Sequence, residues 1–317
     1  MQRQNNKVII DKFCNHYCDA LACTLGEFID IRDSYEDILK LLSLEEAETL
    51  IDYAVLKNKM AGVERLNIKV PVPSLGVKAL EKYDLKGSEI ISAKNYASLP
   101  TSALIGDNTM LDIENLLDYS QELLSSISDF CARADMPICI SIGSNLEEVG
   151  RLVNGYNMSP VEVLESFGFL DRKCFVYGLN FIDKDDQKLL KDYCIMSVFS
   201  PQDDALCGRG AINLYNFIYN DLKFGFSSGK CYNIDMLFEG KLARHNTNNL
   251  MHEGGLVTNE ALLDALCENS EAKLEIELLD AQKLEVLFDK KVYLKDDGYL
   301  DLLSKVTKIA TKIKEKI

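Results

Sequence analysis

The side chains in this sequence that could do chemistry are few and scattered. Asp203 and Asp204 are adjacent, and such a pair could serve in acid–base catalysis or hold a divalent cation, although adjacent acids in a loop are more often solvated or used as caps. Cys14 and His16 stand two residues apart and could form a zinc ligand pair. Arg209 lies between two glycines and could bind an anion. Only three histidines occur in the chain, which limits both metal binding and histidine-assisted catalysis.

Two further groups of residues have simpler explanations than catalysis. Ser141 and Ser144 could suggest a nucleophile, but no histidine or lysine base is expected beside them. The stretch that begins at Ser144 is explained more simply as a helix capping box. Cys14, Cys18 and Cys23 are dense enough for a metal site, yet their spacing suits the passage from a strand to a helix equally well.

The elements that must position these side chains alternate between strand and helix. Four short apolar runs predict strands, and three of them are followed by an amphipathic segment; the runs are 138–141, 174–178, 195–199 and 223–227. Strands that alternate with helices at this spacing indicate βα units on a parallel sheet. Because catalytic groups are placed at the carboxyl ends of parallel strands, the residues at those ends decide the function.

Periodicity and capping signals extend this prediction to the rest of the chain. We expect strands at 8–10, 65–72, 89–93, 273–279 and 285–288, and helices at 43–61, 77–83, 111–134, 234–244, 258–267 and 300–316. No repeat or linker interrupts these elements. We therefore expect a single domain over residues 1–317, with a barrel core over about 8–270 and a C-terminal extension over about 271–317.

Composition limits the class of protein. The chain has 317 residues, of which 47% are hydrophobic and 27% charged, which suits one (β/α)8 barrel or two smaller domains. A net charge of −15 disfavours nucleic acid and anionic membranes as partners. No apolar run approaches the roughly 20 residues of a spanning helix, and the first residues lack the apolar core of a signal peptide. Ten cysteines without a C-x-x-C pair suggest a reducing cytoplasm.

Four stretches in a fixed order carry a family resemblance. They are 167–170 followed by 174–183, 199–204 with 207–210, 225–229 with 233–236, and 256–262. Their order and spacing are similar to the amidohydrolase superfamily, nearest its guanine deaminase and chlorohydrolase type of aminohydrolase. The resemblance runs from Asp11 to about Cys267. It implies a TIM-type (β/α)8 barrel, hydrolysis of C–N bonds at a zinc or iron ion, and dimers that pair barrel to barrel.

The resemblance also implies a metal site that this chain has lost. In that family a His-x-His on the first strand, one histidine each on the fifth and sixth strands, and an aspartate on the eighth hold the metal. The corresponding positions in this chain are Phe13, Asn15, Ser141, Gly178 and Ser228. The family's acid/base position falls on Ser144, and a further histidine position of some members falls on Phe199. None of these side chains is a good ligand, so we expect no bound metal and no cofactor. A shift of one residue on the first strand would make Cys14 and His16 the pair, still without partners on the other strands.

The sequence therefore predicts an amidohydrolase-like protein that is inactive as a metal-dependent hydrolase: a pseudoenzyme that binds a small molecule, regulates, or pairs with an active relative. The alternative is a hydrolase or deaminase of a small nitrogenous compound with a metal-free site, for which Asp203, Asp204 or Cys14 near a strand end would be the feature to look for. The family's flanking β-sandwich is expected to be absent or vestigial. Apolar surface left uncovered in this way predicts a homodimer, or a heterodimer with an active relative.

Overall fold

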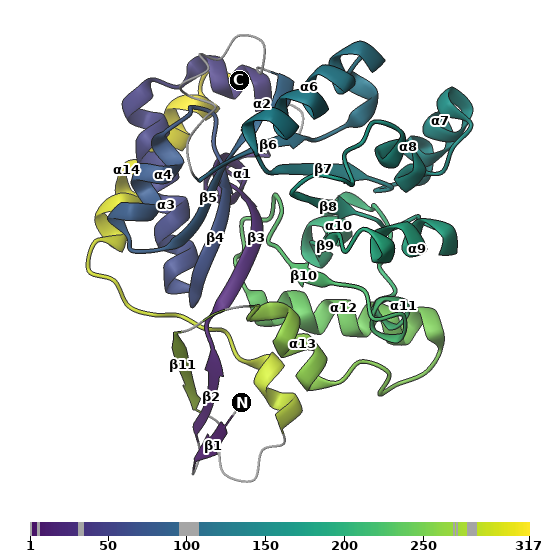
Figure 1. Cartoon of the computed structure of the whole chain (residues 1–317). Helices are drawn as coiled ribbons and strands as arrows, with labels where there is room; N and C mark the ends of the chain where they lie inside the picture. Colours follow the sequence, from purple (N-terminus) through teal and green to yellow (C-terminus); the bar gives the residue numbers. More distant parts are fainter. Residues whose placement is uncertain are drawn as a thin grey trace. The chain divides into compact units, whose positions relative to one another are not determined.

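Eight parallel strands form the sheet on which this α/β chain is built (Figure 1). The computed structural model describes residues 2–4, 7–30, 35–94, 108–268, 270, 272–277 and 284–317. The sheet order is β3-β4-β5-β6-β7-β8-β9-β10, and its strands are β3 (Phe13–Asp19), β4 (Val63–Lys69), β5 (Lys86–Ser92), β6 (Thr109–Ile113), β7 (Ile138–Ile142), β8 (Cys174–Gly178), β9 (Met196–Phe199) and β10 (Phe224–Phe226). A parallel bridge joins Cys18 to Gly229, just past β10. The predicted TIM-type (β/α)8 barrel is confirmed.

Helices follow most of these strands and begin at residues suited to capping. They are α1 (Ala20–Leu25), α2 (Tyr35–Leu41), α3 (Leu44–Met60), α4 (Leu75–Lys82), α6 (Gln121–Ala134), α7 (Leu146–Tyr156), α8 (Pro160–Ser166), α9 (Lys184–Asp192), α10 (Pro201–Cys207), α11 (Leu214–Tyr219), α12 (Met236–Met251), α13 (Asn259–Leu266) and α14 (Tyr299–Lys314). Ser43 and Glu46 form the predicted capping box of α3. Ser159 caps α8, where Pro160 takes the first position because it needs no N–H bond there. Among the described residues, no helix is both long and apolar enough to cross a membrane.

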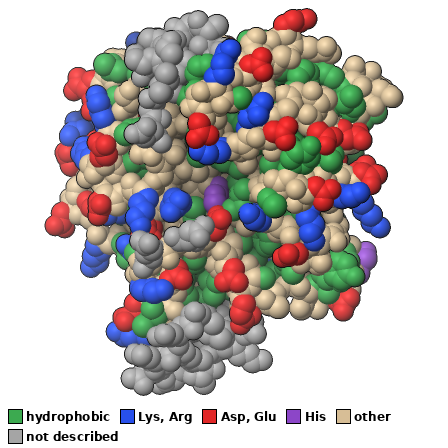
Figure 2. All heavy atoms as spheres, in the orientation of Figure 1, with side chains coloured by type: hydrophobic (Ala, Val, Ile, Leu, Met, Phe, Trp, Pro, Cys, Tyr) green, Lys and Arg blue, Asp and Glu red, His purple; other side chains and the backbone are tan. Residues whose placement is uncertain are grey.

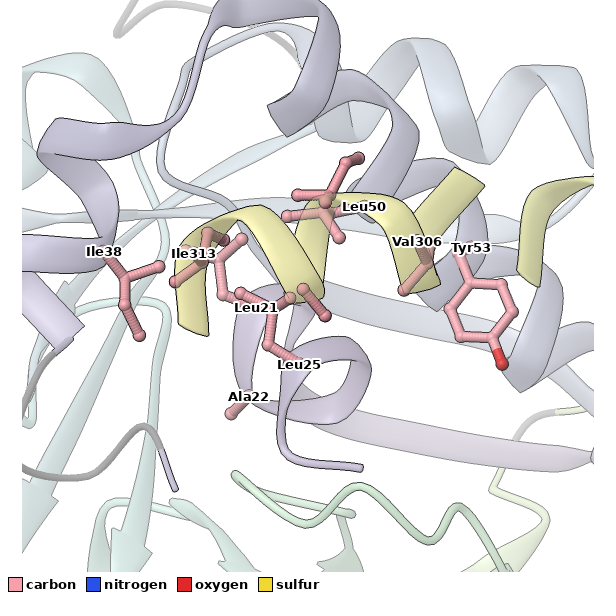
Figure 3. Packing of buried hydrophobic residues seen from close by; sticks show 10 residues of the cluster. Leu21, Ala22, Leu25, Ile38, Leu50, Tyr53, Val306 and Ile313 are labelled. Carbon is pink, nitrogen blue, oxygen red and sulfur yellow. The ribbon is translucent and has the colours of Figure 1, made fainter. Parts of the chain in front are cut away.

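The chain divides into two compact units. The first contains Met1–Ile91, Ser227–Phe238 and Leu266–Ile317, and the second contains Ser92–Phe226 and Glu239–Ala265. In the first unit, α14 packs on α1 and α3, and a cluster that includes Leu25, Leu50 and Val306 is closed to solvent (Figure 3). Burying large aliphatic side chains of this kind contributes about 1.5–3 kcal/mol each. The C-terminal helix is thus part of the core of its unit.

The strand predicted at 8–10 is present, but the barrel core does not begin with it as expected. These residues lie in β2 (Lys7–Asp11), the middle strand of a separate antiparallel sheet in the order β1-β2-β11, with β1 at Gln2–Gln4 and β11 at Lys273–Glu277. Ile10 pairs with Leu274, and Val8 pairs with Ile276. A long-range partner from the end of the chain therefore decides where this strand belongs, and β3 is the first strand of the barrel.

Two other predicted elements are wrong. Residues 111–134 do not form one helix: they contain the end of β6, a 3-10 helix η2 (Leu116–Asp118) and α6. The side chains of Asn115 and Ser120 each accept a backbone N–H bond and start a new element, which splits the amphipathic pattern. The strand predicted at 285–288 is a 3-10 helix η3 (Leu284–Asp289), where the Lys290 N–H bonds the Leu287 carbonyl and turns the chain upon itself.

Candidate functional site

The carboxyl end of β3 lies further along the chain than the positions that the resemblance assigned to the metal. Phe13 and Asn15 lie in the first half of β3, whereas the strand ends at Cys18 and Asp19. The buried Asp19 carboxylate accepts the Ala22 N–H at the start of α1 (3.0 Å) and the Tyr35 hydroxyl (3.1 Å). The charged group at this strand end thus caps a helix. Its sequence signal was an aspartate directly before an apolar helix.

Asn15 and Ser228 are brought together, as the resemblance implied, but they hold each other. The Asn15 amide donates to Ser228 Oγ (2.9 Å) and to Asn58 Oδ1 of α3 (2.7 Å), and the Ser228 N–H donates to Asn15 Oδ1 (3.0 Å). Asn58 in turn donates to the Ala54 carbonyl and to Cys18 Sγ. These side chains are buried, and their donors and acceptors serve one network that ties β3, α3 and the turn after β10. No sequence pattern pointed to Asn58.

Ser141, Ser144 and Gly178 also meet, at the carboxyl ends of β7 and β8. The two serine hydroxyls lie 3.0 Å apart. Gly178 has φ +93°, and a Cβ there would lie 2.4 Å from Ser144 Oγ and 2.9 Å from the Ile142 carbonyl oxygen. Position 178 therefore has no room for a side chain while the Ser144 hydroxyl is in place.

The capping box predicted from Ser144 is displaced by one residue. Asn145 is the N-cap of α7, and its side chain accepts the Glu148 N–H (2.9 Å). The Glu148 carboxylate accepts the Ser144 N–H at 2.9 Å. Asparagine caps as well as serine does, so sequence alone did not distinguish the two registers. The shift leaves the Ser144 side chain free to meet Ser141.

A polar cluster on β6, β7 and β8 was missed by the sequence analysis. The Tyr177 hydroxyl donates to Asp112 Oδ1 (2.8 Å), and Cys139 Sγ lies 3.5 Å from the same oxygen. Burial, and then the negative charge of Asp112, raise the pKa of Tyr177, so this phenol stays a neutral donor. An aspartate within the apolar strand around Leu111 was the available signal, but the sequence analysis had placed it in a helix.

Asp203 and Asp204 are not solvated, contrary to the simplest interpretation of the sequence. They lie in the first turn of α10 and are only 6% and 5% exposed. Arg209 Nη2 is 2.6 Å from Asp203 Oδ2, and Arg209 Nε is 2.9 Å from Asp204 Oδ1. Gly208, with φ +63°, turns the chain so that Arg209 folds back on these acids. Neither the acid pair nor the arginine is left to bind an ion by itself.

Phe199 and Glu239, a third buried acid near α10, complete this region. Phe199 packs edge-on against Phe217, with ring centroids 4.9 Å apart, and is wholly buried. Glu239 accepts the N–H of Gln202 (3.0 Å) and its side-chain amide (2.8 Å). Burial raises the pKa of Glu239 well above its usual value, despite the bonds from Gln202. Phe199 is therefore a core residue.

Cys14 and His16 form a contact of their own on β3. Cys14 Sγ lies 3.9 Å from His16 Nδ1, and His16 Nε2 lies 3.2 Å from Glu268 Oε2, close enough for an ion pair but not aligned for a hydrogen bond. Glu268 follows α13 and was not singled out from the sequence. Within the part of the chain that the structure describes, no three His, Cys, Asp or Glu side chains are grouped to hold a metal.

The metal that the fold family implies does not fit the residues at the corresponding positions. Asn15 and Ser228 use their polar atoms on each other and on Asn58, and Gly178 has no side chain and no space for one. Amide and hydroxyl groups are also weak ligands for zinc or iron beside imidazole and carboxylate.

Solved structures share this barrel, although their sequences are distant. An adenosine deaminase from Xanthomonas campestris, described with bound zinc, has a TM-score of 0.82 at 10% identity, with 98% of this chain and 87% of that chain covered. A guanine deaminase from C. acetobutylicum gives 0.72 at 11% identity, with coverage of 96% and 83%. A triazine hydrolase variant gives 0.76 at 12% identity, covering 96% and 88%. The class is therefore an α/β barrel of the type that these hydrolases have.

Curated sequences add homology over part of the chain. A 5-methylthioadenosine/S-adenosylhomocysteine deaminase from Caldicellulosiruptor saccharolyticus is 25% identical over 99 residues, which are 31% of this chain and 23% of that protein. One from Clostridium tetani is 24% identical over 192 residues, 58% of this chain and 42% of that protein. The chain thus spans less than half the length of the curated relatives it matches. No family model matches. Together with the barrel, these relatives support assignment of the chain to the amidohydrolase superfamily.

Proposed function

We propose that this chain is an amidohydrolase-like protein that does not perform metal-dependent hydrolysis. The observation that carries the proposal is the chemistry at the positions that correspond to the family's metal site. Asn15 is hydrogen-bonded to Ser228 and to Asn58, and Ser141 and Ser144 are hydrogen-bonded to each other beside Gly178. Activation of water by a metal needs three or more ligands of suitable chemistry and an open position. These neutral side chains do not supply such ligands. Ser144 stands where the family has its acid/base and cannot replace it.

On this proposal the protein acts by binding, either of a small molecule or of an active relative. The relatives deaminate 5-methylthioadenosine and S-adenosylhomocysteine, so purine nucleosides are the first ligands to examine. Neutral hydroxyls such as that of Tyr177 can donate hydrogen bonds to such a ligand without transferring a proton. Binding without turnover is the expected behaviour.

The proposal is tested by measuring metal content and ammonia release on the same preparation. Untagged protein is incubated with zinc, iron or manganese and dialysed, and metal is measured by elemental analysis. The protein is then assayed with 5-methylthioadenosine, S-adenosylhomocysteine and guanine, and one of the curated deaminases is assayed in parallel as the positive control. We expect well under one equivalent of metal and ammonia at background. Ammonia release proportional to protein concentration, with stoichiometric metal, would overturn the proposal.

The alternative proposal is a reaction that needs no metal. Asp203 and Asp204 are bound by Arg209 and are not available as a free acid and base. Cys14 is the remaining candidate for such a reaction. It lies beside the His16 imidazole, which in turn lies beside the Glu268 carboxylate.

A further inference from the structure

Cys14, His16 and Glu268 stand in the order nucleophile, base and orienting acid. The sulfur lies 3.9 Å from Nδ1 of the imidazole, and the opposite ring nitrogen lies 3.2 Å from the carboxylate. A thiol, an imidazole that can take its proton, and an acid that orients the imidazole are the parts of an activated cysteine. Contacts of this kind are often long in unliganded proteins, so a spacing of 3.9 Å is compatible with proton transfer.

The backbone around these residues is shaped to hold them. Pairing of β3 with β4 is irregular between Phe13 and Cys14, where β4 has one extra residue, and again between Asn15 and Cys18, where β3 has one extra residue. His16 lies within this second irregularity. Bulges redirect side chains and are frequent beside active sites. The Asn67 side-chain amide donates to the His16 carbonyl at 3.2 Å and fixes the irregular segment.

Glu268 is also held in place. The neighbouring Cys267 thiol donates to the Asp11 carbonyl at 3.1 Å, which anchors the segment after α13 at the end of β2, two residues before β3. Burial opposes a charged His16, but the adjoining Cys14 sulfur and Glu268 carboxylate outweigh it and raise the pKa of His16 to about 10. An imidazolium beside a sulfur is the setting in which cysteines are reactive.

We propose that Cys14 is a peroxide-reactive cysteine, with His16 as its acid/base and Glu268 as a positioning residue. His16 takes the thiol proton, and the Cys14 thiolate attacks one oxygen of hydrogen peroxide. An S–O bond forms as the O–O bond breaks, and the leaving hydroxide takes the proton of His16 and departs as water. Sulfur loses two electrons and the peroxide gains them. The products are Cys14 sulfenic acid, neutral His16 and water.

The small and uncharged character of the oxidant follows from burial. Cys14 is 1% exposed, and the His16 side chain is 10% exposed. A large or charged electrophile would have to displace packed residues, whereas hydrogen peroxide is close to water in size and polarity. The proposal does not depend on the proposed function, because it concerns oxidation of the protein and not hydrolysis of a substrate.

The experiment compares cysteines within one molecule. Wild-type protein, H16N and E268Q receive a brief pulse of hydrogen peroxide in the presence of dimedone, which traps sulfenic acids, and each cysteine is quantified by mass spectrometry. The matched control is Cys139, a barrel-strand cysteine that is also fully buried but whose sulfur faces the Asp112 carboxylate. We expect Cys14 to be labelled at least about tenfold faster than Cys139, with most of that advantage lost in H16N and a smaller part in E268Q.

Two results would overturn the proposal. One is labelling of Cys14 no faster than Cys139 in the wild-type protein. The other is an unchanged Cys14 rate in H16N that circular dichroism shows to be folded. If H16N does not fold, E268Q decides, because Glu268 is only partly buried and its neutral replacement keeps the side-chain shape. An unchanged rate in E268Q would then count against the proposal.

Discussion

At the scale of single residues, space and hydrogen bonding decide what the strand ends can do. Gly178 is confined by Ser144 and by the backbone of Ile142, so the smallest residue is the one that fits. Asn15 and Ser228 meet, as the resemblance implied, but their polar groups are hydrogen-bonded to each other. Both side chains are fully buried, so their polar atoms contribute to the packing of the barrel.

Gly178→Ala should destabilise the protein by about 2 kcal/mol or more, because its φ of +93° is strained for alanine and the Cβ would collide with Ser144 and Ile142. The matched control is Gly150→Ala on α7, where nothing lies within 4 Å of the added carbon. That change should be neutral or stabilising by up to about 1 kcal/mol. Urea unfolding of both variants measures the difference. Equal stability of the two would contradict the collision.

At the scale of elements, buried ion pairs hold loops against strands and helices. Arg209 folds back on the first turn of α10, and Glu64 of β4 binds the segment that leads into β11. Asp203, Asp204 and Glu64 are largely closed to solvent, although Lys86, which pairs with Glu64, is half exposed; in surface pairs such as Lys173 with Asp135 both side chains are exposed. Removing one partner of a buried pair leaves the other charge without compensation. Substitutions at these pairs should therefore destabilise the protein more than other substitutions in the same loops.

Arg209→Ala should cost about 3–5 kcal/mol of unfolding free energy, because it leaves Asp203 and Asp204 buried and repelling each other. Adding Asp203→Asn and Asp204→Asn to the same variant should recover part of the loss. Lys173→Ala on the exposed pair serves as the control and should change stability by less than about 1 kcal/mol. Chemical denaturation of the set gives the values. A loss in R209A no larger than in K173A would mean that the pair is not buried in solution.

The lowered pKa of Glu64 predicts that the protein loses stability in acid. Burial by itself would raise its pKa, but the Ser270 hydroxyl, the Ala272 N–H and Lys86 outweigh burial and lower the pKa to about 2. A carboxylate with a depressed folded pKa contributes stability above its unfolded pKa of 4.5, and that contribution is lost as the pH falls towards 2. Glu64→Gln should therefore cost about 2 kcal/mol at pH 7, after allowance for screening, and almost nothing at pH 2. Urea unfolding between pH 7 and pH 2 measures the unfolding free energies of the wild type and the variant, which should become equal at pH 2. A difference that persists at pH 2 would mean that the charge of Glu64 is not its cause.

At the scale of the whole molecule, charge and exposed apolar residues bear on association. The face drawn in Figure 2 carries lysine and arginine scattered among aspartate and glutamate, without one basic patch. Leu146 and Val153 of α7 are 69% and 44% exposed, on a helix of which only Leu152 is buried. At physiological salt a net charge of −15 is screened beyond about 8 Å, so it does not prevent contact between copies.

We expect a homodimer in solution. An interface of about 1,600 Å² would suffice for a specific complex, and apolar side chains left on the surface favour one. Light scattering at micromolar concentration should give a mass near twice the 35.7 kDa of one chain. Raising the salt should leave a mainly apolar dimer intact. A mass of one chain at every salt concentration would rule the homodimer out and leave pairing with an active relative as the remaining form of association.

The sequence alone determined the elements whose signals are local. The apolar runs of β7 to β10 and the start of α3 each depend on residues within one or two turns, and they were predicted. The alternation of strand and helix was enough to predict a parallel sheet, whereas the barrel was implied by the family resemblance. Local signals misled in residues 111–134, where the end of β6, η2 and α6 share one amphipathic pattern.

The tertiary structure alone decided which side chains meet. Alternation along β3 places Cys14 and His16 on one face and Asn15 on the other, but packing between distant segments decides that Asn15 contacts Asn58 of α3. The burial of Asp203 and Asp204 depends on Arg209 folding back, and Glu268 reaches His16 from a segment far along the chain. Contacts of this kind arise from packing between distant segments, and no periodicity within a single segment encodes them.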